Sequence, residues 1–150
     1  MNHFKIFNLK PEFDIDQKSL LVKYFELQKE NHPDQNNNSS DSSNINEAYE
    51  ILKDDISRAE YLLNLKEISL PNLKMDVLAE FLEENEDIEN SVDKDNLKKI
   101  LDQKNSKLKE IILKMSIIFD DNISKFAILC TEAKYIKRMI SNIKQKIKIL

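Results

Sequence analysis

Residues 27–36 read LQKENHPDQN, and the tripeptide His32-Pro33-Asp34 within them decides how the first half of the chain folds. The apolar residues before the tripeptide recur at helical spacing and predict a helix over residues 17–31. Pro33 ends this helix, because proline has no N–H to donate and its ring clashes with the preceding turn. Proline also moves His32 away from helical dihedrals. We therefore expect an imidazole and a carboxylate at the tip of a helical hairpin, where a partner can contact them.

The segments on either side of the tripeptide contain signals for helix starts. Asp16 is placed to accept hydrogen bonds from the backbone N–H groups of the first turn of the preceding helix. Residues 35–43, QNNNSSDSS, are low in complexity and predict a polar loop. Ser43 or Asn44 is then expected to cap the next helix, and a separate short helix is predicted after residues 54–55.

The second half of the chain contains three amphipathic stretches that are joined by short polar segments. Their apolar residues lie within residues 77–88, 97–115 and 123–147. Such a pattern predicts an antiparallel bundle of three helices, and Pro71 breaks the helical pattern before it. The predicted fold is all-α, with a helical hairpin and short flanking helices linked to a three-helix bundle. The predicted domains are residues 1–68, a linker over residues 69–75, and residues 76–150.

Composition restricts the class of function. The 150 residues contain no glycine, which excludes the Gly-rich loops that bind nucleotide phosphates. The net charge of −4 argues against nucleic acid as a main partner, because that binding needs a basic surface. No apolar run approaches the roughly 18 residues that cross a membrane, so no membrane partner is expected. The single cysteine, Cys130, suits a reducing compartment, and we expect a cytoplasmic protein.

Catalytic chemistry has little support in the sequence. The chain has two histidines, and its histidines and cysteine show no metal-ligand spacing, so we expect neither a metal nor another cofactor. His32 and Asp34 could be imagined as the acid–base pair of a small hydrolase. No nucleophile or oxyanion-stabilising group accompanies them, and a simple helix stop also explains their spacing. The sequence therefore favours a protein that is not an enzyme.

The second half contains two charged segments, an acidic one around residues 80–89 and a basic one at the C-terminal end. Leu78, Leu82 and Glu86 are spaced four residues apart, so they lie on one side of a helix. This strip either docks a partner or lies inside the bundle, and spacing alone favours burial. The basic C-terminal helix is expected to balance its own dipole and to remain solvated. Its basic residues are Lys134, Lys137, Arg138, Lys144, Lys146 and Lys148.

The residues around the tripeptide resemble a J-domain. The predicted helix leads to the His-Pro-Asp tripeptide and then to the polar loop. The segment INEAYEIL at residues 45–52 and the segment RAEY at residues 58–61 follow this loop. The opening FKIFNL at residues 4–9 and the closing Tyr61-Leu62-Leu63 narrow the resemblance to the HscB family, the J-domain co-chaperones of iron–sulfur cluster assembly. A second domain of three helices is also similar to that family. The resemblance covers nearly the whole chain.

The resemblance implies a bacterial co-chaperone that stimulates ATP hydrolysis by a DnaK/HscA-type chaperone. It assigns the contact with that chaperone to His32, Pro33 and Asp34, with Lys23 and Lys29 on the preceding helix. Glu26 and Glu30 depart from the family by diluting the positive charge of this helix.

The resemblance also implies a client, the scaffold protein IscU, on which iron–sulfur clusters form. It assigns client contacts to the C-terminal domain, at Leu78, Leu82, Glu83, Glu86 and Tyr135. Ala79 and Asn85 replace a methionine and an arginine that the family often has on this strip. A general J-domain co-chaperone with another client is the alternative.

Overall fold

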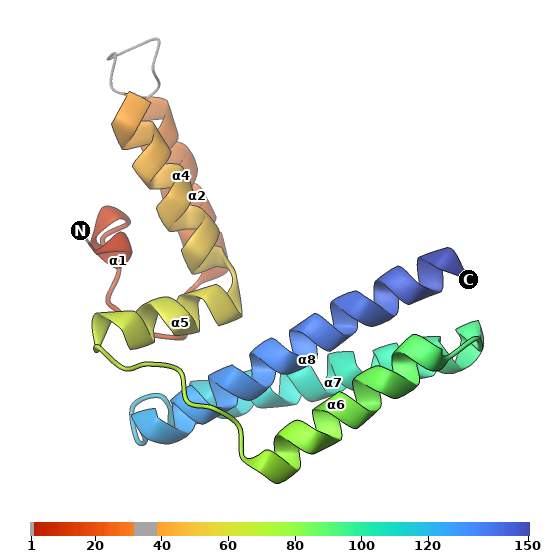
Figure 1. Cartoon of the computed structure of the whole chain (residues 1–150). Coiled ribbons are helices and arrows are strands. Elements are labelled where there is room, and N and C mark those ends of the chain that lie inside the picture. The colour runs from red at the N-terminus through yellow and green to blue at the C-terminus, as the bar shows by residue number, and fades with distance from the viewer. Residues whose placement is uncertain (1, 32–38) are drawn as a thin grey trace. The chain divides into compact units, whose positions relative to one another are not determined.

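The computed structural model describes residues 2–31 and 39–150. All the regular secondary structure among these residues is α-helical. The chain divides into two compact units, Met1–Glu67 and Ile68–Leu150 (Figure 1). The N-terminal unit contains a helical hairpin with short flanking helices, and the C-terminal unit contains three long helices. The all-α prediction is therefore confirmed, together with its division into a hairpin and a three-helix bundle.

The N-terminal unit consists of α1 (His3–Ile6), α2 (Gln17–Glu30), α4 (Ser39–Lys53) and α5 (Asp55–Leu65). The helices α2 and α4 pack against each other as the hairpin, and α1 and α5 also contact α4. Aromatic and aliphatic side chains from all four helices and from the segment before α2 fill the core. Those that are fully buried include Phe4, Phe7, Phe13, Leu20, Leu52, Leu62 and Leu63.

Side-chain caps determine where two of these helices begin. The Asp16 carboxylate accepts hydrogen bonds from the backbone N–H groups of Lys18 and Ser19, at 3.0 and 3.2 Å, as predicted for the start of α2. The Asp54 carboxylate accepts from the Ser57 N–H at 2.9 Å and separates α5 from α4. The predicted short helix after residue 54 is thus confirmed.

The prediction of a loop through residue 43, with a cap at Ser43 or Asn44, is wrong. The helix α4 already begins at Ser39. The Ser42 hydroxyl donates to Gln28 Oε1 at 2.8 Å, and Gln28 Nε2 donates to the Ser42 carbonyl oxygen at 3.4 Å. These bonds from α2 favour a helical backbone in a polar run that has no apolar face of its own. A prediction from local sequence misses this start of α4, because the stabilising bonds come from another helix.

The C-terminal unit consists of α6 (Met75–Asn90), α7 (Lys94–Ile118) and α8 (Ile123–Ile149). The helix α8 packs along α7, and α6 packs against α8 (Figure 1). Near the α6–α7 turn the core is a cluster of Ile88, Leu97, Met139 and Ile143. The Thr131 hydroxyl donates to the Pro71 carbonyl oxygen at 2.9 Å, so part of the predicted linker lies against α8.

None of the helices in the described ranges is long and apolar enough to cross a bilayer. Among these same residues, no three histidine, cysteine, aspartate or glutamate side chains are grouped so that they could hold a metal ion.

Candidate partner-binding surfaces

The predicted trigger, His32-Pro33-Asp34, lies outside the described residues. The structure does show how the helix before it ends. The backbone N–H of Asn31 donates to the Leu27 carbonyl oxygen at 3.0 Å, and the Asn31 side-chain amide donates to the same oxygen at 2.9 Å. Asn31 therefore completes α2 directly before the tripeptide.

The hairpin that carries the tripeptide is joined by aromatic and polar contacts. The Tyr24 and Tyr49 rings stack with their centroids 4.1 Å apart. Asn46 Oδ1 accepts hydrogen bonds from the Tyr24 hydroxyl and from Gln28 Nε2, each at 2.5 Å. These contacts link α2 to α4, so the two helices that lead to and from residues 32–38 have a defined mutual orientation.

The two predicted chaperone-binding lysines lie on different parts of α2. Lys23 is half-buried and Lys29 is exposed. Six residues separate them, which places them about 120° apart around the helix. Val22 and Phe25, which are 54% and 61% exposed, share a face with Lys29. Sequence reasoning missed this apolar pair, although its i, i+3 spacing is visible in the sequence.

The predicted scaffold-binding strip on α6 lies mainly on the surface. Leu82 is 61% exposed, Glu83 and Glu86 are exposed, and Leu78 is half-buried. Ile88, in contrast, is 3% exposed and belongs to the core of the bundle. The interpretation in which the whole strip is buried therefore does not hold for Leu82, and this leucine is available to a partner.

Tyr135, the fifth predicted scaffold contact, lies at the seam between α6 and α8. Its ring is tilted against the Phe81 ring, with the centroids 5.4 Å apart. Phe81 directly precedes Leu82, so this contact brings Tyr135 of α8 to the segment of α6 that carries the strip. Sequence reasoning counted Phe81 among the apolar residues of α6 but did not pair it with Tyr135.

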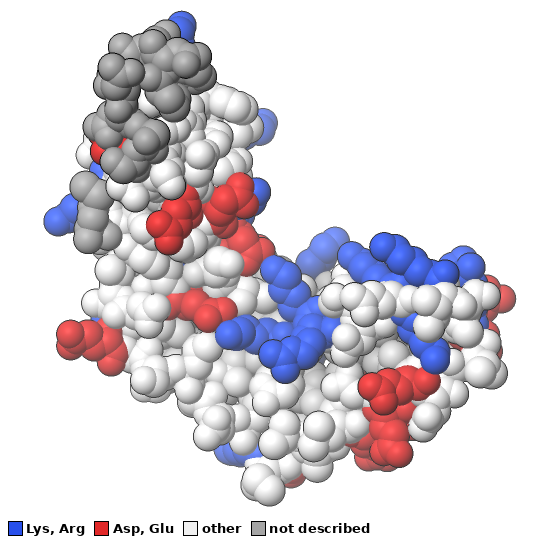
Figure 2. Space-filling model, turned by 45° about the horizontal axis from the view of Figure 1, so that its top comes forward, with Lys and Arg blue, Asp and Glu red and all other residues white. Residues whose placement is uncertain are grey.

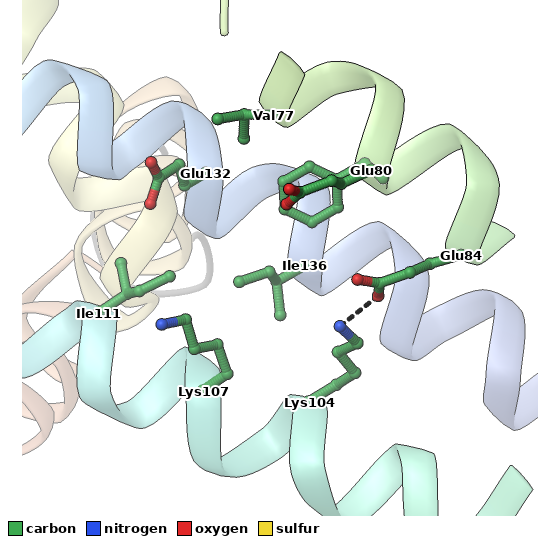
Figure 3. Close-up of a pocket in the computed structure, with 9 residues that line it drawn as sticks. Val77, Glu80, Glu84, Lys104, Lys107, Ile111, Glu132 and Ile136 are labelled. Atoms are coloured by element: carbon green, nitrogen blue, oxygen red, sulfur yellow. Dashed lines mark ion pairs between the residues drawn. The ribbon is translucent and has the colours of Figure 1, made fainter. Parts of the chain in front are cut away.

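A cavity of about 180 Å³ lies between α6, α7 and α8 (Figure 3). At its edge the Glu84 carboxylate of α6 points toward the Lys104 ammonium of α7 and pairs with it. Lys107 adds one positive charge, and Glu80 and Glu132 add two negative charges. Ile136 and Val77 are among the apolar side chains of the lining. The lining has no histidine, cysteine or serine, and its polar groups are the carboxylates of glutamates and the ammonium groups of lysines.

Two known protein families match separate parts of the chain. Residues 2–61 match the DnaJ domain, and residues 73–144 match the HSCB C-terminal oligomerisation domain. Among curated proteins, the co-chaperone protein HscB of Proteus mirabilis (strain HI4320) is 38% identical over 114 residues, which are 65% of this chain and 66% of that protein. The HscB homolog of Pseudoalteromonas atlantica is 38% identical over 79 residues, 47% of this chain and 45% of that protein. The matches thus span between about half and two thirds of these relatives' length.

Solved structures match the chain over almost its full length. The chaperone HscB from Vibrio cholerae is 25% identical with a TM-score of 0.80, over 97% of this chain and 96% of that one. The human co-chaperone protein HscB is 27% identical with a TM-score of 0.84, over 99% of this chain and 81% of that one. The Jac1 co-chaperone of Saccharomyces cerevisiae, 21% identical with a TM-score of 0.80 over 96% of this chain and 97% of that one, shares the fold.

Proposed function

The chain belongs to the HscB family, and on this basis we propose that it is a co-chaperone with no catalytic activity of its own. Its N-terminal unit stimulates ATP hydrolysis by a DnaK/HscA-type chaperone. Its C-terminal unit delivers the iron–sulfur scaffold protein IscU to that chaperone for cluster maturation and transfer. The proposal requires no cofactor, nucleic acid or membrane.

The chaperone half of the proposal rests on the hairpin. His32, Pro33 and Asp34 follow the capped end of α2 in the sequence, and exposed Lys29 precedes His32 by three residues. A carboxylate such as Asp34 suits a charge-assisted hydrogen bond with arginine. Lysines such as Lys23 and Lys29 mainly accelerate and orient the encounter with an acidic partner surface. These contacts suit a transient activator that must leave after ATP hydrolysis.

The client half of the proposal rests on one observation, the 61% exposure of Leu82 beside exposed Glu83 and Glu86. Contiguous apolar surface that is rimmed by polar side chains marks protein interaction sites. Half-buried Leu78 lies one turn before Leu82, and Tyr135 extends the surface onto α8 through its contact with Phe81.

The proposed compartment is the bacterial cytoplasm. Bacterial proteins named HscB are among the relatives, and the single cysteine, Cys130, is buried within α8. A chain with one buried cysteine forms no internal disulfide, which suits a reducing compartment.

Chaperone activation is tested by ATP turnover of an HscA-type chaperone with wild type and with the His32→Gln variant. Wild type is expected to raise turnover, and His32→Gln is expected to abolish the increase. The matched control is Lys99→Gln, a change at an exposed residue of α7. Equal stimulation by wild type and His32→Gln contradicts the role of the tripeptide.

Client binding is tested by calorimetry with the IscU-type scaffold. The Leu82→Ala variant removes an exposed apolar contact and is expected to weaken binding by about 1–2 kcal/mol. The matched control is Leu113→Ala, because Leu113 is a similarly exposed leucine, at 65%, on α7 of the same unit. If wild type activates the chaperone but does not bind the scaffold, the chain is a general J-domain co-chaperone with another client.

A further inference from the structure

The second half of α8 presents basic side chains of one sign along one face. Residues 134–150 contain no aspartate or glutamate. Five of their basic residues fall on one stripe at helical spacing and span about 21 Å of the helix. This α8 stripe consists of Lys134, Lys137, Arg138, Lys144 and Lys148, of which all but Lys134 are exposed.

The helix dipole does not account for this α8 stripe. The field of a helix terminus acts on charges within the last turn. In α8 that turn contains only Lys146 and Lys148. Arg138 lies about three turns before the end of the helix at Ile149, and Lys144 lies more than one turn before it. The expectation that these residues balance the dipole therefore fails for most of the stripe.

The neighbouring helix α6 has the opposite charge. It contains seven acidic residues and no basic residue: Asp76, Glu80, Glu83, Glu84, Glu86, Asp87 and Glu89. In Figure 2 basic side chains form a band along α8 in the C-terminal unit, and acidic side chains gather over α6, with uncharged surface between them. The two strips of opposite sign thus lie on either side of the α6–α8 seam.

The seam between these strips contains a groove near the C-terminal ends of α6 and α8. Lys146 Nζ donates to the Glu89 carbonyl oxygen at 2.9 Å, which ties the two helices together at one end. Beside this bond lies a cavity of about 290 Å³ whose lining includes Asn142, Gln145 and Ile149. Gln145 lies three residues before Lys148 and seven residues after Arg138, positions that share one face of a helix, so the groove borders the α8 stripe. A partner seated over Leu82 can therefore continue across the groove onto α8.

We propose that the protein docked on the α6 strip crosses the seam and places an acidic segment on the α8 stripe. This inference rests on the proposed function, because the docked protein is the scaffold client. The exposed cations Arg138, Lys144 and Lys148 favour a negatively charged occupant. A long polyanion, such as nucleic acid or an anionic lipid surface, fits less well, because Glu83 and Glu86 would repel it. A folded protein can present an acidic segment to α8 and apolar or basic groups to α6.

The test compares two triple variants that remove the same charge from exposed positions. Arg138→Gln/Lys144→Gln/Lys148→Gln alters the α8 stripe, and the matched control changes three exposed lysines of α7 to glutamine. These control positions are Lys98, Lys99 and Lys109. Scaffold association is measured by stopped flow at low and high salt. The α8 variant is expected to associate roughly tenfold more slowly at low salt and to lose most of its salt dependence. The control is expected to behave like wild type.

A second measurement uses wild-type protein and needs no variant. A carbodiimide that joins amines directly to carboxylates is expected to link Lys144 or Lys148 to an aspartate or glutamate of the scaffold. Circular dichroism of both triple variants checks that the helices remain intact.

The possible results separate this inference from the proposed function. If Leu82→Ala weakens scaffold binding but the α8 variant and the α7 control bind alike, the inference is wrong and the proposed client stands. If wild type does not bind the scaffold, the proposed client is wrong and the inference fails with it. Loss of binding to nucleic acid or anionic vesicles in the α8 variant, with unchanged scaffold binding, also overturns the inference.

Discussion

The ring of Phe81 in α6 lies against the ring of Tyr135 in α8, with the centroids 5.4 Å apart and the ring planes inclined by 32°. Both side chains are half-buried. The contact therefore lies at the boundary between the core of the C-terminal unit and its surface. It is one of the contacts through which the helix that carries Leu82 packs on α8.

We expect the two rings to stabilise the C-terminal unit jointly. In a double-mutant cycle with Phe81→Ala and Tyr135→Ala, the coupling free energy should be about 0.5–1.5 kcal/mol, typical of an aromatic pair. Unfolding of this unit in urea is measured by chemical modification of the Cys130 thiol, because Cys130 is fully buried in α8 of the folded protein. Two losses of stability that simply add would show that the rings do not interact.

Arg58 should be the most sensitive polar position of the N-terminal unit. It is 3% exposed, and its Nε and Nη1 donate to the carbonyl oxygens of Phe13 and Leu52, at 2.6 and 2.7 Å. Replacement by leucine leaves both buried oxygens without these donors and should cost about 3 kcal/mol. Arg58→Lys should recover little of this, because an ammonium does not reproduce the planar fork of donors.

Tyrosine fluorescence measures the Arg58 effect in the correct unit. The chain has four tyrosines and no tryptophan, so a Tyr135→Phe background leaves only the three in the N-terminal unit. The control is Asp55→Asn, since Asp55 pairs with Arg58 Nη2 but is 45% exposed. That change should cost under about 1 kcal/mol. Equal losses for Arg58→Leu and Asp55→Asn would assign the stability to the ion pair instead of the buried carbonyl bonds.

Local signals predict much of this fold, and contacts between distant residues account for what they miss. Asp16 marks the start of α2 correctly, because a cap involves only the neighbouring turn. The start of α4 is missed, because Gln28 stabilises the turn around Ser42 from another helix. The orientation of Leu82 also depends on tertiary packing, since helical spacing alone does not show which face α8 covers. The roles of the predicted site residues remain predictions.

His3 should make the N-terminal unit less stable in mild acid. Its ring stacks on Tyr61 at 4.5 Å between centroids, and its Nδ1 is buried without a hydrogen-bond partner. Desolvation by burial lowers the pKa of His3 below its ordinary value of 6.5, and the nearby Glu47 carboxylate offsets part of this shift. The folded state therefore binds a proton less readily than the unfolded state. Stability should be complete above about pH 6.5 and should fall as the pH decreases from there.

The His3→Phe variant isolates this titration, because phenylalanine keeps a ring against Tyr61 but has no titrating group. Urea midpoints of the N-terminal unit at pH 7.5 and 5.5 should differ more for wild type than for His3→Phe. A drop of the same size in both proteins would assign the acid sensitivity to other groups.

Leu82 and Ile88 lie on the same helix, but truncation should destabilise the protein strongly only at Ile88. Ile88→Ala leaves a cavity in the core beside Leu97, Met139 and Ile143 and should cost about 2–5 kcal/mol of unfolding free energy. Leu82→Ala removes a side chain that is 61% exposed and should change stability by no more than about 0.5 kcal/mol. Cys130 modification in urea, with circular dichroism of the native variants, measures both. A cost for Leu82→Ala close to that for Ile88→Ala would mean that this leucine packs in the core, and loss of scaffold binding by that variant would then report unfolding instead of a lost contact.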